Sequence, residues 1–464
     1  MIKKDVCKKI LDICLSTGGD FAEIFAEDTT KGTYELTKSK VTKANTVKLH
    51  GVSIRILRGF EEVSGYTNDF SFESMKDLAE KLSSAFPKDK NSKKIKFKLV
   101  EEKAPEITKA IKLPSKVKTK DKVGYLKRGY AVLKNYSKEI SQVICTLSDE
   151  EQNVLIVNSL GKYIKDLRTH TRLTITTVAG KGNNMQTARE DVGGNEGYEI
   201  LDRTNIEKMA TEAADAAIKM VHADEMVGGK MTVVVHNAFG GVLLHEACVH
   251  ALEATSVAKG SSVFCNKLGK KIASDIVTAI DDGTRTNQWG SLNIDDEGNK
   301  TQRNVLIENG ILKSYLVDYR NSRIMNHPIT GSGRRQSYRY SPTSRMSNTF
   351  FAPGNSTFEE IIANTEYGLF AKKMGGGSVN PSTGEFNFAV NEGYMIENGK
   401  ITKPVRGATL VGSGAEILMN IDMIGNNLDF GHGMCGSISG SIPTDVGQPT
   451  IRVQNITVGG RGKK

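Results

Sequence analysis

Two histidines and a glutamate lie within six residues of one another in the segment 241–253, which reads GVLLHEACVHALE. Neutral imidazoles bind zinc, and an adjacent carboxylate can accept a proton from zinc-bound water. Apolar residues recur at i, i+3, i+4 and i+7 from Leu244, which predicts a helix with its apolar stripe toward a core. His245 and Glu246 lie off that stripe. We therefore take His245 and His250 as candidate metal ligands and Glu246 as the candidate catalytic acid and base.

The spacing of the two histidines constrains the helix. Residues at i and i+4 lie roughly 40° apart around a regular helix, whereas residues at i and i+5 lie about 140° apart. His245 and His250 have the second spacing, so a regular helix would not let them share one ion. The segment must widen locally, as in a π-bulge, or break near His250. A regular helix through His250 would exclude a two-histidine site and favour a buried histidine of structural role.

A catalytic zinc usually has three protein ligands and one open position. Cys248 lies on the apolar stripe and is expected in the core. Cys435 is favoured as the third ligand, because the glycine-rich segment GHGMCG can direct its thiol toward a site. Glu253 is expected near the metal or at the surface rather than as a ligand. The other residues considered are Cys265, His222, His236, His327 and His432.

The elements around these residues predict an α+β protein of two domains. Residues 1–225 are expected to form an N-terminal domain of antiparallel sheet with helices, and residues 226–464 a β-rich C-terminal domain that carries the HExxxH helix. Amphipathic patterns predict helices at 3–17, 72–86, 120–137 and 205–221, and alternating runs predict strands between them. The polar, glycine-rich segment 181–198 is expected to be a loop. Two Ile-Glu-Asn-Gly segments predict hairpins, and 412–428 is expected to be helical.

The amino-acid composition limits the class of protein and indicates its cellular compartment. The N-terminus has no pattern of a signal peptide, and no apolar run approaches the roughly 20 residues of a membrane span. Six scattered cysteines without a CxxC pair indicate reduced thiols and a cytoplasmic location. The net charge of +10 comes largely from a lysine-rich stretch at 88–138. That stretch has little arginine and few aromatics, which favours a solvated surface and linker over a nucleic-acid site.

Several ordered segments give the chain a family resemblance. They are HExxxH followed by Glu253, the segments 293–298, 333–338 and 345–348, the segment KPVRGATLVGSG at 403–414, GMCG at 433–436, VGQPT at 446–450 and DFAEIF at 20–25. Together they resemble the TldD/PmbA family of metallopeptidases, in the TldD-like branch that retains the metal motif. The chain differs from the family at Val249, where glycine is usual, and at Thr255, where an acidic residue is common.

The resemblance implies that His245, His250 and Cys435 bind Zn²⁺ and that Glu246 is the catalytic residue. It also implies a dimer, either of two identical chains or with a PmbA-like subunit, that admits unfolded or short peptides to an enclosed cavity. We expect Arg334, Arg335 or Arg345 to bind the peptide's carboxylate or carbonyls, with structural ion pairs as the alternative. No nucleic acid or membrane partner is expected. The rival functions are a non-catalytic, metal-holding subunit of a heteromeric protease and a nucleic-acid or gyrase-associated regulator.

Overall fold

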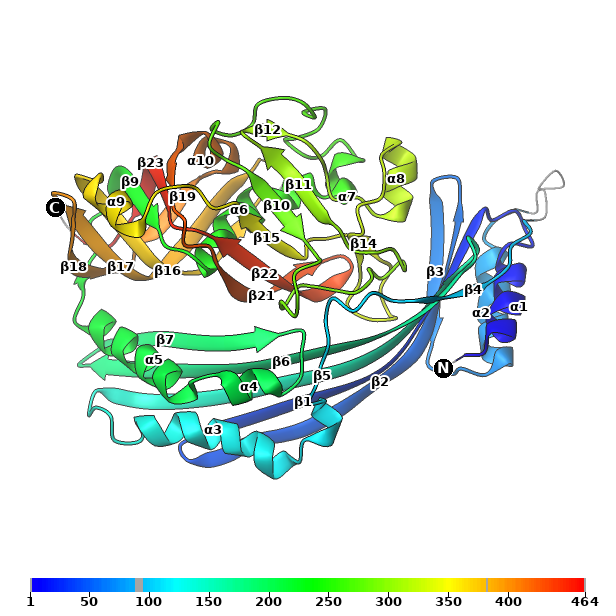
Figure 1. Cartoon of the computed structure of the whole chain (residues 1–464), viewed down its shortest axis with the longest axis horizontal. Coiled ribbons are helices and arrows are strands. Elements are labelled where there is room, and N and C mark those ends of the chain that lie inside the picture. Colours follow the sequence, from blue (N-terminus) through cyan, green and yellow to red (C-terminus); the bar gives the residue numbers. More distant parts are fainter. Residues whose placement is uncertain (1, 88–94, 381–382, 463–464) are drawn as a thin grey trace.

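The computed structural model describes residues 2–87, 95–380 and 383–462. A long, curved sheet from the first half of the chain arches beneath a compact β-rich second half (Figure 1). This arrangement confirms the predicted α+β class. Residues 88–94, at the start of the lysine-rich stretch, lie outside the described residues. No helix within the described ranges is long and apolar enough to cross a membrane.

The N-terminal sheet has the strand order β3-β2-β1-β5-β6-β4, with β7 on β6. All neighbours are antiparallel except β4 and β6, which are parallel. The strands are β1 (Phe21–Thr37), β2 (Lys40–Arg58), β3 (Glu61–Thr67), β4 (Val100–Lys103), β5 (Ile140–Asn158), β6 (Lys162–Lys181) and β7 (Asn184–Gly194). Four of them span 17 to 20 residues, and this length allows one sheet to extend under the whole second half.

Helices cover one face of this sheet. Because side chains alternate along a strand, Ala22 and Ile24 of β1 point to the same face as Tyr34 and Leu36. The first pair packs in the core beneath α1 (Lys4–Cys14) and α2 (Phe72–Ser83), and the second pair packs in the core beneath α3 (Thr119–Leu133) and α5 (Ile206–Val221). The short helices of this half are η1 (Pro114–Lys116) and α4 (Glu199–Arg203).

The opposite face of the sheet meets the second half through buried charges. Glu23 of β1 accepts hydrogen bonds from Arg55 and Arg335, and Arg55 also donates to Glu297 at 2.7 Å. These four side chains are almost completely buried. Removing one partner would leave a buried charge unpaired, which typically costs roughly 3–5 kcal/mol. The two halves are therefore held together by matched charges as well as by apolar packing.

The second half contains two main sheets around one core. The six-stranded sheet has the order β12-β11-β10-β15-β22-β21, and the eight-stranded sheet has β16-β9-β23-β19-β17-β18-β8 with β20 on β23. The strands are β8 (Asp224–Glu225), β9 (Gly229–Val235), β10 (Ala279–Asp282), β11 (Arg303–Glu308), β12 (Ile311–Leu312), β13 (Gly333–Arg334), β14 (Thr343–Ser344), β15 (Asn348–Phe351), β16 (Tyr367–Val379), β17 (Glu385–Glu397), β18 (Lys400–Arg406), β19 (Thr409–Ser413), β20 (Ile421–Ile424), β21 (Asp429–Ser437), β22 (Gly440–Gln448) and β23 (Ile451–Gly459).

The helices of this half are short. They are η2 (Phe239–Gly241), α6 (Val242–Ala247), η3 (Val249–Leu252), α7 (Ala254–Val257), α8 (Tyr319–Met325), α9 (Phe358–Ala363) and α10 (Gly414–Asn420). Leu243, Leu244 and Ala247 of α6 share one core with Phe351 of the six-stranded sheet and Phe388 of the eight-stranded sheet. The segment with the two histidines is thus enclosed between the sheets.

The structure also tests the predicted elements. Both Ile-Glu-Asn-Gly segments form hairpin turns, and Asn309, Gly310, Asn398 and Gly399 have positive φ as expected. The prediction of a loop at 181–198 is wrong, because most of the segment is strand β7 paired with β6. The prediction of a helix over 412–428 is correct only for α10, since residues 421–424 form β20.

Candidate metal centre

The histidine segment is distorted near His250, as the spacing of its histidines requires. Helix α6 ends at Ala247, and Cys248 leaves the helical region with φ −127° and ψ −58°. The chain then continues as the 3₁₀ helix η3. This interruption, two residues before His250, turns the second imidazole toward the first. The predicted distortion near His250 is confirmed, and its form is a break rather than a π-bulge.

Strand β21 brings Cys435 to the two imidazoles. The Sγ atom lies 3.2 Å from His245 Nε2 and 3.3 Å from His250 Nε2. One ligand atom from each residue lies within 4.8 Å of the other two. His245 and Cys435 are buried, whereas His250 is partly exposed. Three potential metal donors from segments about 190 residues apart therefore converge on one point, with His250 on the open side.

The charge state of Cys435 suits a metal ligand. Burial alone would raise the pKa of its thiol, but the charges and hydrogen bonds of His245 and His250 lower that pKa to about 3. The thiolate is the form that binds metals. Cys248 contrasts with it, since burial in the core raises the pKa of this thiol to about 12. The expected core position of Cys248 is thus confirmed.

The donor set and its spacing fit zinc. A tetrahedral zinc with bonds of about 2.0–2.3 Å holds its donors roughly 3.3–3.7 Å apart. The two nitrogen–sulfur separations are within a few tenths of an ångström of that range. Glu246 Oε2 lies 3.6 Å from His250 Nε2, and the Glu246 side chain is 28 % exposed. This carboxylate therefore stands beside the cluster and in reach of solvent.

Arg345 and Glu253 contact residues of the cluster without belonging to it. Arg345 is fully buried and donates to the backbone oxygen of Cys435 at 2.6 Å and to Ser439 and Gly440 on the adjoining turn. Its Nε lies 3.6 Å from Glu253 Oε1, and Glu253 Oε2 lies 3.4 Å from His250 Nδ1. Arg345 thereby connects the strand that carries the sulfur to the carboxylate beside one imidazole.

The three arginines singled out in the sequence are all buried, and each has a different environment. Arg345 makes the contacts just described. Arg335 pairs with Glu23 and lies against the ring of Phe25. Arg334 donates to the backbone oxygen of Met346 at 2.6 Å. The contacts of Arg335 and Arg345 match the alternative of structural pairing, and a role of any of the three in binding substrate stays a prediction.

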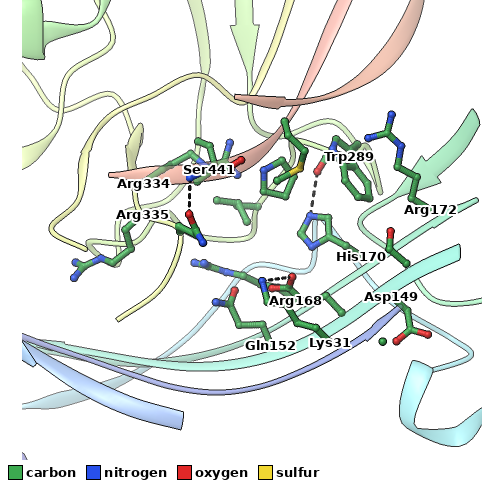
Figure 2. A pocket seen from close by; sticks show the side chains of 18 of the residues that line it. Lys31, Asp149, Gln152, Arg168, His170, Arg172, Trp289, Arg334, Arg335 and Ser441 are labelled. Carbon is green, nitrogen blue, oxygen red and sulfur yellow. Dashed lines mark hydrogen bonds and ion pairs between the residues drawn. The ribbon is translucent and has the colours of Figure 1, made fainter. Parts of the chain in front are cut away.

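Arg334 and Arg335 line a pocket of about 240 Å³ between the N-terminal sheet and the β21–β22 hairpin (Figure 2). None of its described lining residues belongs to the cluster of His245, His250 and Cys435, here called the metal cluster. The pocket residues His170 and Trp289 were not among the candidates predicted from the sequence. His170 sits in an ordinary alternating run, and the only signal at Trp289 is that it is the single tryptophan of the chain. A larger hollow of about 910 Å³ lies between β7, α5, β16 and β21.

Comparison with known proteins identifies the family to which this two-part α+β chain belongs. Family models match residues 22–86 as domain 1, residues 112–221 as the central domain and residues 228–460 as the C-terminal domain of the PmbA/TldA metallopeptidases. The chain belongs to the PmbA/TldD family of metallopeptidases. This finding confirms the resemblance drawn from the sequence.

Relatives match along most of the chain. A metalloprotease TldD homolog of Buchnera aphidicola from Schizaphis graminum is 34% identical, and the match covers 98% of this chain and 96% of the relative. The TldD homolog of Haemophilus influenzae is 41% identical over 69% of this chain and 68% of its own length. A relative in Saccharolobus solfataricus, 30% identical over 62% of this chain and 64% of its own length, is named a zinc metalloprotease TldD homolog.

Two solved structures share the fold. TldE from Thermococcus kodakarensis superposes with a TM-score of 0.77 at 18% identity, covering 98% of this chain and 99% of that one. A Thermotoga maritima protein described as a candidate modulator of DNA gyrase gives a TM-score of 0.80 at 20% identity, with the same coverage. At these identities the likeness establishes the fold alone.

Proposed function

We propose that this chain is a zinc-dependent peptidase that hydrolyses unfolded or short peptides. The observation that carries the proposal is the meeting of a thiolate and two imidazoles beside the carboxylate of Glu246. The name of the Saccharolobus relative supports zinc as the metal. A mixed set of imidazole and thiolate ligands also suits zinc.

The residues have distinct roles in this proposal. His245, His250 and Cys435 would hold the ion, which would supply Lewis-acid polarisation of a peptide carbonyl and of a water molecule. Glu246 accepts the proton of the attacking water and delivers it to the leaving amine. Its partial exposure lets a peptide approach from the side of His250. Glu253 and Arg345 orient His250 and the strand of Cys435 without touching the substrate.

The assembly and the compartment belong to the same proposal. We infer that the working enzyme is a dimer, of identical chains or with a PmbA-like subunit, and that it encloses the site in a cavity. Such an enclosure would restrict cleavage to chains without folded structure. The described cysteines form no disulfide with one another, and we infer the cytoplasm as the compartment. The division of the chain at residue 225 likewise stays a prediction.

Metal analysis of three purified variants tests the proposal. Cys435→Ala is expected to lose zinc and activity toward a fluorescently labelled, unfolded polypeptide. Glu246→Gln is expected to keep about one zinc per chain and to lose activity. Cys248→Ala is the matched control, because it removes a core thiol outside the cluster, and it should retain both properties.

The same experiment separates the rival functions. Activity that persists in Glu246→Gln would refute the assigned catalytic role, and zinc retained by Cys435→Ala would refute the ligand set. A metal-holding subunit without catalysis would bind zinc and cleave nothing in any variant. A gyrase-associated or nucleic-acid regulator would instead bind DNA with an affinity that falls steeply with salt.

A further inference from the structure

Arg334 is a buried cation that has no carboxylate within ion-pair distance among the described residues, although Asp296 and Asp281 act on it from farther away. Its side chain makes no ion pair with any described residue, its Nε has no hydrogen-bond partner, and its residue is only 3% exposed. Burial lowers the pKa of this guanidinium to about 10. The four other cations around the pocket are already paired: Lys31 with Glu150, Arg168 with Asp296, Arg172 with Asp191 and Arg335 with Glu23. Since Asp296 and Asp281 compensate this buried charge only from a distance, an anion bound in the pocket would stabilise it further.

His170 has a second polar atom in the same pocket without a hydrogen-bond partner in the described part of the chain. Its Nε2 lies 3.1 Å from the backbone oxygen of Trp289 (Figure 2), and a carbonyl oxygen only accepts, so this nitrogen carries the hydrogen. Burial lowers the pKa of His170 to about 4, which keeps the ring neutral. Its Nδ1 is therefore a bare acceptor, and this atom has no partner among the described residues. Within the described ranges, Arg334 and His170 thus each have a buried polar atom without a partner at the wall of the pocket.

The walls of the pocket define the size and character of the ligand. Trp289 is fixed by a hydrogen bond from its indole nitrogen to the backbone oxygen of Gly433 at 2.8 Å. Leu292, Met434, Ile442 and Pro443 add apolar surface around it. Drug-sized ligands occupy about 300–1,000 Å³, so a cavity of about 240 Å³ suits one or two amino-acid residues.

We propose that this pocket binds the C-terminal residue of a short peptide. The terminal carboxylate pairs with Arg334, the amide N–H of the same residue donates to His170 Nδ1, and the side chain lies against Trp289. A peptide C-terminus carries both required groups on a single residue. An inorganic anion offers the charge without the amide donor. The inference rests on the proposed peptidase function for its biological meaning, but the binding itself is measurable without turnover.

This peptide-terminus site is separate from the metal cluster. Successive side chains of a strand point to opposite faces, and Met434 lines the pocket whereas Cys435 joins the imidazoles. A peptide terminus bound at Arg334 therefore lies across β21 from the metal ligands of its own chain. The site anchors a peptide or retains a product, rather than presenting its terminal bond for cleavage.

Trp289 gives a direct assay, because it is the only tryptophan in the chain and forms a wall of the pocket. The full-length Glu246→Gln protein is titrated with N-acetyl-alanyl-alanine and, separately, with its C-terminal amide, by tryptophan fluorescence and calorimetry. We expect the acid to bind at least tenfold more tightly than the amide. Acetate, which lacks the amide donor, should bind more weakly than the acid.

Variants identify the anchoring residue. Adding Arg334→Met should weaken binding of the acid about 10- to 100-fold, the loss expected when a hydrogen bond to a charged group is removed. Arg334→Lys should restore part of it. The thermal stability of Arg334→Met should stay close to that of its parent, since removal of a buried charge is offset by loss of the hydrogen bond to Met346. Arg128→Met, which removes an exposed arginine paired with Glu207, is the control and should bind as its parent does.

Three results would overturn the inference: equal affinity for acid and amide, unchanged binding in Arg334→Met, or no heat and no fluorescence change with millimolar acid. Because the protein in this assay cannot turn over, none of these results bears on the peptidase proposal. Conversely, an inactive wild-type enzyme that binds the acid through Arg334 would refute the peptidase and leave the peptide-terminus site standing.

Discussion

Arg345→Met tests how the metal cluster is held together. The substitution keeps an unbranched, buried side chain but removes three hydrogen bonds, one to the backbone oxygen of Cys435 and two to Ser439 and Gly440. It also leaves the buried Glu253 carboxylate without its nearby cation. Loss of one member of a buried ion pair costs roughly 3–5 kcal/mol of folding free energy. Loss of an outer contact to a metal ligand typically weakens metal binding by about 10- to 100-fold.

We therefore expect Arg345→Met to lower zinc affinity about 10- to 100-fold and to lower the free energy of unfolding by about 3 kcal/mol or more. Zinc affinity is measured by competition with a chromophoric chelator, and stability by denaturant unfolding of the zinc-free protein. Arg334→Met is the matched control, because it exchanges the same two residue types at another buried position that has no contact to the cluster. If Arg345→Met does not fold, Glu253→Gln takes its place. It keeps the shape of the Glu253 side chain and should reproduce part of the loss of zinc affinity. Zinc affinity within threefold of wild type in both folded variants would refute the positioning role.

Two further predictions concern packing and pH. A Cβ atom on Gly414 would lie 1.8 Å from the backbone oxygen of Ala247, so Gly414→Ala should displace α6, weaken zinc binding and cost roughly 1–3 kcal/mol or more of stability. Gly436→Ala, next to Cys435 and with open space around its Cβ, should do neither, and equal effects in the two variants would contradict the packing argument. The pKa of His170 is lowered by burial from 6.5 to about 4, so the unfolded chain takes up this proton first as the pH falls. Stability from His170 is therefore complete above pH 6.5 and is lost toward pH 4, by ~3 kcal/mol at about 1.4 kcal/mol per tenfold change in protonation. Unfolding measured at pH 7 and pH 4 should show a smaller loss in His170→Gln than in wild type, and equal losses would show that the buried ring does not control this pH dependence.

Local sequence patterns were sufficient to predict the four long helices of the first half and a distortion near His250. The i, i+5 spacing left no regular helix that could join His245 to His250, so geometry required a distortion. Strand β7 was missed because its glycine-rich and polar residues have no apolar alternation, and its strand state comes from pairing with β6. The helix predicted over 412–428 failed beyond α10 because Ile417, Ile421 and Ile424 have helical spacing, yet residues 421–424 pair with β23.

The candidate site, like the fold, could be predicted from the sequence only in part. The sequence signal for Cys435 was its glycine-rich setting together with the family resemblance, and its Sγ does lie beside both imidazoles. The environments of Arg334 and Arg345 were not predictable, because the sequence does not show which buried arginine meets a carboxylate and which does not. That distinction depends on contacts between residues far apart in the chain, such as Arg335 with Glu23.

The distance along the chain between His245 and Cys435 has a consequence for biosynthesis. During translation the two imidazoles emerge from the ribosome about 190 residues before the sulfur, and β21, the strand that carries the sulfur, pairs with the later strand β22. A growing or prematurely ended chain therefore has an incomplete set of ligands. With the proposed ligand set, metal capture is therefore expected late in maturation, after the strand that carries the sulfur has been made.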